Sequence, residues 1–281
     1  MNSSFGTLYI VATPIGNLQD ITYRAIEVLS SVDLIAAEDT RHSQKLLAAY
    51  QIHTTMIAYH AHNEQKSADL LIEKLKSGLD IALISDAGTP LISDPGYTLV
   101  QQAHEQGITV TPIPGASALI AGLSVSGLPT QPVSFYGFTP NKAAARRDLY
   151  TALATQNATL VFYESPHRIL ASLKDMAEVF GNTRQVVLMR ELTKTFETIL
   201  TGSVAELVEI VAADDNQQRG EIVMCVAPAE VDSNAQQQLA EQLLPLLLAE
   251  LPVKTASKIT SQVSGVSKNV AYEMALGLKE K

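Results

Sequence analysis

The first half of the chain alternates short apolar runs with amphipathic segments, and this rhythm constrains the fold more than any other feature. Apolar runs that favour buried strands lie at 8–12, 32–37, 81–84 and 110–113. Helical spacing of apolar residues lies at 21–31, 43–50, 64–77 and 97–106. Strands that alternate with helices form parallel sheets, because a crossover must return the chain to the same edge. The pattern predicts an α/β fold whose mostly parallel sheet is covered by helices.

A segment rich in glycine and proline, 126–132, marks a domain boundary. Beyond it, strands are expected at 134–138, 159–163, 185–190, 196–201 and 221–227, with helices at 143–155, 167–180 and 203–212. Several of these strands follow one another with little helix between them, which favours a mixed sheet. After Pro228 two helical patterns flank a glycine-bearing turn, as in a helix-turn-helix. We therefore predict an α/β domain over 6–125, a second α/β domain over 126–229 and a small helical domain over 235–281.

The loop at 85–96 is the strongest candidate for a binding site. It follows an apolar strand, and ligands of open α/β sheets bind at the carboxyl ends of strands. Gly88 and Gly96 allow the backbone to approach a ligand closely, whereas Asp86 and Asp94 have no adjacent lysine or arginine. The loop therefore suits a ligand with hydroxyl groups or positive charge better than a bare phosphate.

Composition narrows the class of protein. The single cysteine, Cys225, excludes an internal disulfide framework and is typical of a reducing cytoplasm. No stretch is apolar over the roughly 20 residues of a membrane span, so we expect a cytoplasmic protein without a membrane partner. A net charge of -9 argues against nucleic-acid binding driven by overall charge, although basic residues cluster locally. No cluster of histidine and cysteine has the spacing of metal ligands, so no metal is expected.

Six segments taken together resemble the tetrapyrrole-methylase superfamily over about residues 8–227. They are 13–20, 37–41, 85–96, 114–118, 164–168 and 190–194. The resemblance implies two α/β domains with S-adenosylmethionine in the cleft between them, usually in a homodimer. Members with small-molecule substrates carry a glycine-rich first loop, whereas this chain has Thr13-Pro14-Ile15-Gly16-Asn17. That loop and the helical tail are similar to the branch that 2′-O-methylates a cytidine ribose in 16S ribosomal RNA of the small subunit.

The resemblance also implies which residues bind the cofactor. They are Pro14, Ile15, Asp86, Gly88, Thr89, Pro90, Ser117, Ala118, Phe162, Leu192 and Ala227. Four of these residues also have a purely structural interpretation. Asp86 and Ser117 suit turn formation and helix capping, and Phe162 and Leu192 suit core packing.

On the substrate side, Glu191 and Lys194 are candidates for handling the proton of the ribose hydroxyl, and His62 or Glu64 for meeting the ribose. Basic residues that suit phosphate contacts are Arg41, Lys142, Arg146, Arg147 and Arg168. A solvated charged face, a local ion network around Arg41 and helix capping before Glu64 are the corresponding structural alternatives.

Two other functions remain open from the sequence. One is a small-molecule methyltransferase of the tetrapyrrole type. The other is a non-catalytic nucleic-acid-binding protein that uses the C-terminal helices. From Pro252 onward the sequence contains five lysines and two glutamates, a local excess of positive charge. A short helical capping hairpin would explain those helices equally well.

Overall fold

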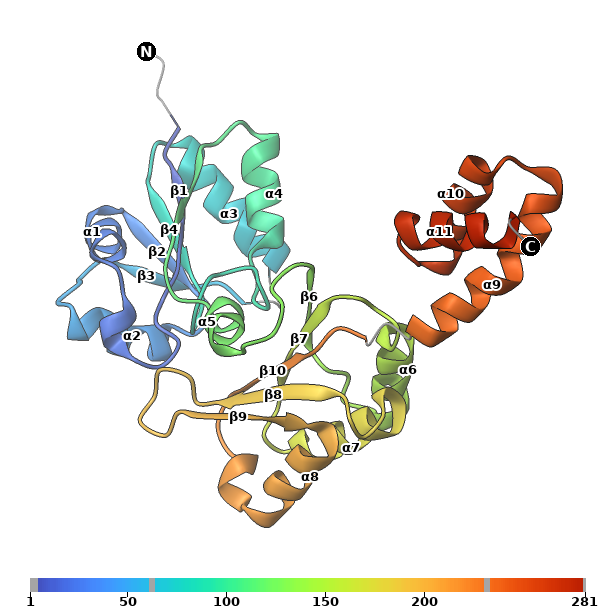
Figure 1. The fold of residues 1–281 in the computed structure, drawn as a ribbon. Coiled ribbons are helices and arrows are strands. Elements are labelled where there is room, and N and C mark those ends of the chain that lie inside the picture. Colours follow the sequence, from blue (N-terminus) through green and yellow to red (C-terminus); the bar gives the residue numbers. More distant parts are fainter. Residues whose placement is uncertain (1–4, 61–63, 230–232, 280–281) are drawn as a thin grey trace. The chain divides into compact units, whose positions relative to one another are not determined.

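The computed structural model describes residues 5–60, 64–229 and 233–279 (Figure 1). The chain forms two compact units, one ending at Pro228 and the other beginning at Ala229. Both predicted sheets lie in the first unit. The boundary at 126–132 stays a prediction within it.

The first sheet is entirely parallel, as the sequence pattern predicts. Its strands are β1 (Leu8–Val11), β2 (Leu34–Ala37), β3 (Met56–Ala58), β4 (Ile81–Ile84) and β5 (Val110–Ile113), in the order β3-β2-β4-β1-β5. The sequence pattern missed β3, because this three-residue edge strand is only partly buried and has no long apolar run. The order places β1 between β4 and β5, so the loops that follow these three strands meet at one edge.

Helices cover both faces of this sheet. They are α1 (Tyr23–Ser31), α2 (Thr40–Ala49), α3 (Glu64–Lys76) and α4 (Tyr97–Glu105), with a 3-10 turn at Leu18–Asp20. Helix α5 (Ala118–Val125) follows β5 and packs against the second sheet instead. In Figure 1, α1 and α2 lie on one side of the strands and α3 and α4 on the other. Successive residues of β4 serve both faces, because Leu83 packs in the α3–α4 core and Ile84 in the α1–α2 core. Burial on both faces explains why the strand is a continuous apolar run.

The second sheet is mixed, which also confirms the sequence prediction. Its strands are β6 (Val133–Phe138), β7 (Thr159–Glu164), β8 (Gln185–Arg190), β9 (Thr198–Ser203) and β10 (Ile222–Val226), in the order β6-β7-β10-β8-β9. Only β6 and β7 pair in parallel. The helices of this half are α6 (Ala143–Leu153), α7 (Ile169–Phe180) and α8 (Val204–Ala213), followed by a 3-10 turn at Asp215–Gln218.

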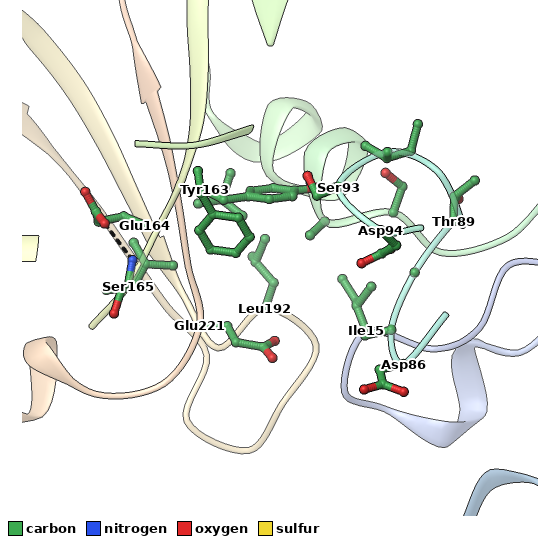
Figure 2. Close-up of a pocket in the computed structure, with 18 of the residues that line it drawn as sticks. Ile15, Asp86, Thr89, Ser93, Asp94, Tyr163, Glu164, Ser165, Leu192 and Glu221 are labelled. Atoms are coloured by element: carbon green, nitrogen blue, oxygen red, sulfur yellow. Dashed lines mark hydrogen bonds between the residues drawn. The ribbon is translucent and has the colours of Figure 1, made fainter. Parts of the chain in front are cut away.

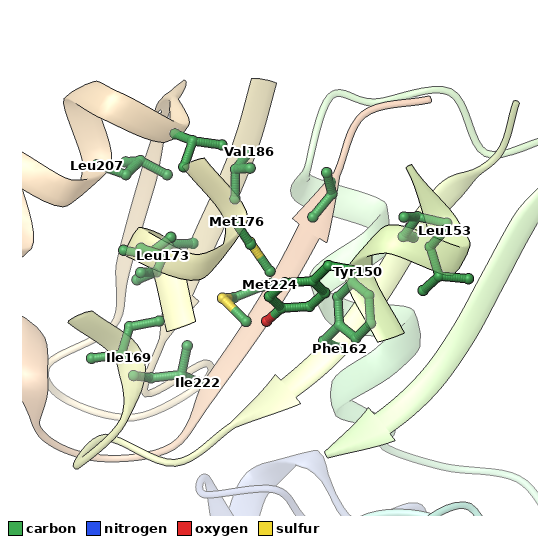
Figure 3. Close-up of a cluster of buried hydrophobic side chains, with 14 of the residues drawn as sticks. Tyr150, Leu153, Phe162, Ile169, Leu173, Met176, Val186, Leu207, Ile222 and Met224 are labelled. Carbon is green, nitrogen blue, oxygen red and sulfur yellow. The ribbon is translucent and has the colours of Figure 1, made fainter. Parts of the chain in front are cut away.

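The two faces of the second sheet have different partners. One face forms a core with α6, α7 and α8 (Figure 3). The other face packs against Ile15 and α5 of the first half. Phe162 lies in the helix-covered core, where it is fully buried and its ring stacks on Tyr136 at 5.5 Å between centroids. The side chain of Phe162 thus points away from the second sheet's other face, and its expected contact with the cofactor stays a prediction.

Arg146 is also buried, contrary to its expected role in phosphate binding. Its side chain is 3% exposed and its Nε donates to Asp175 Oδ2 at 2.7 Å. Arg147 donates to the other oxygen of the same carboxylate at 3.0 Å and is 39% exposed. Lys142, Arg146 and Arg147 lie close together in the sequence, but the sequence alone does not show that the packing of α6 buries Arg146.

The second unit is a bundle of three helices. They are α9 (Ser233–Glu250), α10 (Val253–Ser264) and α11 (Lys268–Lys279). Gly265 ends α10 with φ of 82°, a left-handed conformation that glycine adopts without strain. The sequence therefore indicated the turn of the helix pair correctly. Among the described helices of the chain, none is long and apolar enough to span a membrane.

Replacing Arg146 with Met should lower the free energy of unfolding by about 3–5 kcal/mol, because it leaves the Asp175 carboxylate buried with its main partner removed. Arg147→Met is the matched control, since it removes a cation from the same carboxylate on the solvent side. We expect a much smaller loss there, because water screens the exposed pair. Urea unfolding of both variants measures the difference, and equal losses would contradict the assignment.

Candidate functional site

A cavity of about 370 Å³ lies between the carboxyl edge of the first sheet and the open face of the second (Figure 2). The first half contributes residues from the loops after β1, β2, β4 and β5. The second half contributes the end of β7, the loop after β8 and the start of β10. Figure 2 shows Ile15, Asp86 and Thr89 on one side of the space and Tyr163 and Leu192 on the other.

Backbone hydrogen bonds hold the loops of the first half together. Thr13 N–H donates to Gly88 O at 2.9 Å, and Gly88 N–H donates to Thr13 O at 3.0 Å. Gly88 has φ of 82°, which a residue with a Cβ rarely adopts. The Thr89 hydroxyl donates to Ala116 O at 3.1 Å. The loop after β4 is thus hydrogen-bonded to the loop after β1 and to the loop after β5.

The charged side chains that line the cavity are all acidic. They are Glu38, Asp86, Asp94, Glu164 and Glu221, of which Glu164 turns its carboxylate away from the cavity toward Arg168 and Thr139. No lysine, arginine or histidine is among the described residues of the wall. Asp86 Oδ1 accepts the N–H of Asp39 at 3.0 Å, which fixes one of these carboxylates. A wall of this kind favours a ligand that carries positive charge.

Burial and mutual repulsion shift two of these carboxyl groups. Burial, followed by the charges of Asp94 and Asp86, raises the pKa of Glu38. Burial also raises the pKa of Asp94, together with Asp86 and against a hydrogen bond from Ser85. Because the folded protein holds these protons more tightly than the unfolded chain, their contribution to stability falls as the pH rises through the raised pKa. A bound cation would offset that cost.

The opposite wall is apolar and aromatic. Leu192 and Val223 line it together with the ring of Tyr163, which packs edge-on against Phe138 at 5.5 Å between centroids. The Tyr163 hydroxyl accepts the N–H of Leu119 at 3.1 Å and thereby joins β7 to the start of α5. Tyr163 is therefore the aromatic residue of β7 that faces the cavity. Sequence reasoning chose its neighbour because an alternating strand of apolar residues does not reveal which face is covered by helices.

Most of the residues expected to bind the cofactor meet in this cavity. Those on its wall are Ile15, Asp86, Gly88, Thr89, Ser117, Ala118 and Leu192. Pro14 lines a neighbouring cavity, and Pro90 is buried without reaching either wall. Ala227 lies beyond the far end of β10, about 16 Å along the strand from Ile222, and it is not part of the cavity wall.

Glu191 and Lys194 lie together beside the cavity, but as an ion pair. Lys194 Nζ contacts Glu191 Oε1 at 2.8 Å and Glu221 Oε2 at 3.1 Å. Burial opposes the charge on Lys194, yet the two carboxylates outweigh it and raise the pKa of the lysine. Burial likewise opposes the charge on Glu191, but hydrogen bonds from Lys194 and from the Glu221 N–H lower the pKa of this carboxyl. Lys194 is thus held protonated, which does not suit a proton acceptor.

The other residues expected on the substrate side are distributed around the fold. Glu64 caps α4, because its Oε1 accepts the N–H groups of Gly96 at 3.1 Å and Thr98 at 3.2 Å. It does not line the cavity, and its expected contact with the ribose stays a prediction. His62 lies outside the described residues.

The expected phosphate-binding residues are mostly paired with carboxylates. Arg168 lies 2.9 Å from Glu164, at the edge of the cavity, and Arg41 lies 3.5 Å from Asp39 on the surface. Lys142 is exposed at the start of α6. Within the described ranges, no group of three or more histidine, cysteine, aspartate or glutamate side chains is arranged to hold a metal ion.

Several residues on the wall were not among those expected to form the site. The loop at 85–96 contributes Ile92, Ser93 and Asp94, and the end of β7 contributes Ser165 and Pro166. Asp94 and the segment 164–168 had signals in the sequence, since both follow strands. The contribution of Val223 depends on strand pairing, because β10 lies beside β7 only in the folded sheet.

The model of the tetrapyrrole (corrin/porphyrin) methylases matches residues 7–208, and that of the RsmI C-terminal helix-turn-helix domain matches residues 234–279. The curated relatives include a ribosomal RNA small subunit methyltransferase I of Pseudomonas aeruginosa, 54% identical over 97% of this chain and 98% of that protein. The protein of the same name from Vibrio cholerae is 53% identical over 96% of this chain and 94% of its own length.

Among solved structures, the uroporphyrin-III-C-methyltransferase of Thermus thermophilus has a similar fold. Its TM-score is 0.56 at 21% identity, covering 79% of this chain and 94% of that one. This likeness concerns the fold alone. Because a family model matches well over half of the residues, and close relatives match nearly all of them, the chain belongs to the tetrapyrrole methylase family, in the group of its small subunit ribosomal RNA methyltransferase I relatives.

Proposed function

We propose that this protein is an S-adenosylmethionine-dependent methyltransferase that 2′-O-methylates a cytidine ribose in 16S ribosomal RNA of the small subunit. The acidic cavity at the edge of the first sheet is the observation that carries the proposal. Relatives named for small subunit ribosomal RNA support the substrate. An enzyme with this substrate would work in the cytoplasm.

The residues of the cavity fit a cofactor with an amino acid part, a ribose and an adenine. When bound, S-adenosylmethionine supplies a methyl group on a positively charged sulfur. Asp86, Glu38 and Asp94 would face its positive groups, while Ser117 and Ala118 bring the start of α5 to the wall. Tyr163 and Leu192 provide the apolar surface that an adenine ring requires.

Methyl transfer to a hydroxyl group depends mainly on positioning and on removal of the hydroxyl proton. Glu191 and Lys194 do not suit the second task, because Lys194 is held protonated and Glu191 already accepts two hydrogen bonds.

The two alternatives from the sequence have less support. A small-molecule methyltransferase would need neither the Thr13–Asn17 form of the first loop nor the C-terminal helical unit. A non-catalytic nucleic-acid-binding protein would have no use for a cavity that gathers the carboxylates of Glu38, Asp86 and Asp94. Repulsion and burial in that cavity lower stability, so a functional ligand is the better explanation.

A homodimer is supported by α5. All of its residues except Ser124 lack a polar side chain, which is typical of a buried helix. One face packs on the second sheet through Leu119, Ala121 and Leu123. Ile120 is nevertheless 62% exposed and Val125 is 49% exposed. A second copy of the chain would cover this face.

Replacing Asp86 with Asn should weaken S-adenosylmethionine binding by about tenfold or more, because a charge-assisted contact contributes roughly 1.5–3 kcal/mol. Asn keeps an oxygen that can accept the Asp39 N–H, so the loop should stay in place. Calorimetry with the cofactor measures the loss, with Asp148→Asn on the exposed face of α6 as the control.

Mass mapping of 16S ribosomal RNA from a strain lacking the protein should show one unmethylated cytidine ribose, restored by the wild type and not by Asp86→Asn. An unchanged methylation map would contradict the proposed function.

S-adenosylmethionine affinity should fall as the pH is lowered through the raised pKa values of Glu38 and Asp94, because these carboxylates then become protonated and lose their attraction for the cation. S-adenosylhomocysteine, which has no charge on sulfur, should show a weaker dependence. The double variant Glu38→Gln with Asp94→Asn should flatten the profile of the charged cofactor. Parallel pH profiles for the two ligands in the wild type would refute the role of these carboxylates.

Ile120→Glu should shift the protein from dimer to monomer, since it places a charge in the centre of the proposed apolar interface. Sedimentation velocity measures the change. Circular dichroism shows whether the fold persists in the variant. A wild-type protein that sediments as a monomer at high concentration would rule the dimer out.

A further inference from the structure

A second cavity, of about 380 Å³, lies beside the first and shares part of its wall. The common residues are Ile15, Asp86, Ala87 and Glu221. The rest of its wall comes from the loop after β1, from α2 and from Lys194. A molecule in the second cavity would thus meet one in the first across the Ile15–Asp86 wall.

The two cavities differ in charge. The described wall of the first contains no basic residue, whereas His42, Lys45 and Lys194 all line the second. Its two carboxylates, Asp86 and Glu221, belong to the shared wall. The basic side chains of α2 therefore lie on the part of the second cavity's wall that the first cavity does not share. The carboxylates of Asp86 and Glu221 lie on the wall that the two cavities have in common.

His42 and Lys45 are the basic side chains of this region that remain available to a ligand. They are exposed, and their spacing of three places them on one face of α2. Neither forms an ion pair with any residue in the described part of the chain. Arg41, Arg146, Arg147 and Arg168, by contrast, each contact a carboxylate.

Two further features fit a polar ligand. The Ser43 hydroxyl on the wall is buried and has no hydrogen-bond partner among the described residues. On the opposite side, the side chain of Lys194 crosses Gly16 so closely that a Cβ there would overlap it. Gly16 thereby lets the ion pair of Lys194 with Glu191 and Glu221 close this side of the cavity.

We infer that the second cavity binds the ribose-phosphate backbone of the acceptor RNA strand, with phosphate toward His42 and Lys45 and the ribose toward the shared wall. This inference rests on the proposed function and adds the position of the substrate. Anionic phosphate matches the ammonium of Lys45, which has no acidic partner among the described residues, and an imidazole N–H of His42, while a ribose hydroxyl matches carboxylates that accept hydrogen bonds. This arrangement brings the acceptor strand to the described residues that line both cavities, where the strand would lie next to the cofactor.

The test uses the full chain with the double variant His42→Gln and Lys45→Gln. The apparent KM for small ribosomal subunits should rise about tenfold or more at moderate salt, while kcat stays within about twofold, because phosphate contacts contribute binding energy without taking part in the chemistry. The slope of log affinity for a single-stranded RNA oligonucleotide against log salt should fall by about one, as expected for the loss of Lys45.

Lys174→Gln is the matched control, since this exposed lysine of α7 lines neither cavity. Calorimetry with S-adenosylhomocysteine should give the same affinity for the double variant as for the wild type. Unchanged RNA affinity in the double variant, an equal loss in Lys174→Gln, or a parallel loss of cofactor affinity would each overturn the inference. A wild type that binds the oligonucleotide through His42 and Lys45 but leaves ribosomal RNA unmethylated would instead contradict the proposed function.

Discussion

The hydrogen-bonded bridge between Thr13 and Gly88 is the interaction on which the site depends. It joins the loops that follow β1 and β4, which are neighbouring parallel strands at the centre of the first sheet. Because both loops leave the sheet at the same edge, the bridge places Ile15 beside Asp86. These two residues then form part of the wall between two cavities. The positive φ of Gly88 makes the bridge possible, since a side chain there would strain the loop.

Charge is separated across that wall. The first cavity brings carboxyl groups together, and burial together with neighbouring acidic charges raises the pKa of Glu38 and of Asp94. The second cavity carries the basic side chains. A protein with a net charge of -9 thus keeps a local basic surface, because the arginines near the site have acidic partners whereas Lys45 on α2 has none among the described residues. Net charge alone is a poor guide to an anionic substrate when the charges are sorted in this way.

The second sheet shows how far local sequence determines a site. Strand positions followed from apolar runs, and β8 lies where the run predicts it. The choice between Phe162 and Tyr163 did not, because both are large aromatic residues on adjacent positions of β7. Helices α6, α7 and α8 cover one face of the sheet, and this packing alone turns Phe162 inward and Tyr163 toward the cavity. Arg146 is a similar case, since only the packing of α6 on α7 brings it to Asp175.

The sequence by itself determined the alternation of strands and helices, the two kinds of sheet and the three strand-end loops that meet at the site. These features depend on periodicity and on local backbone preferences, which neighbouring residues encode. The tertiary structure decided which face of each element is covered, which cations have acidic partners and which carboxylates share a cavity. Those outcomes depend on contacts between residues far apart in the chain, such as Lys194 with Gly16 and Glu221, and no local pattern specifies them.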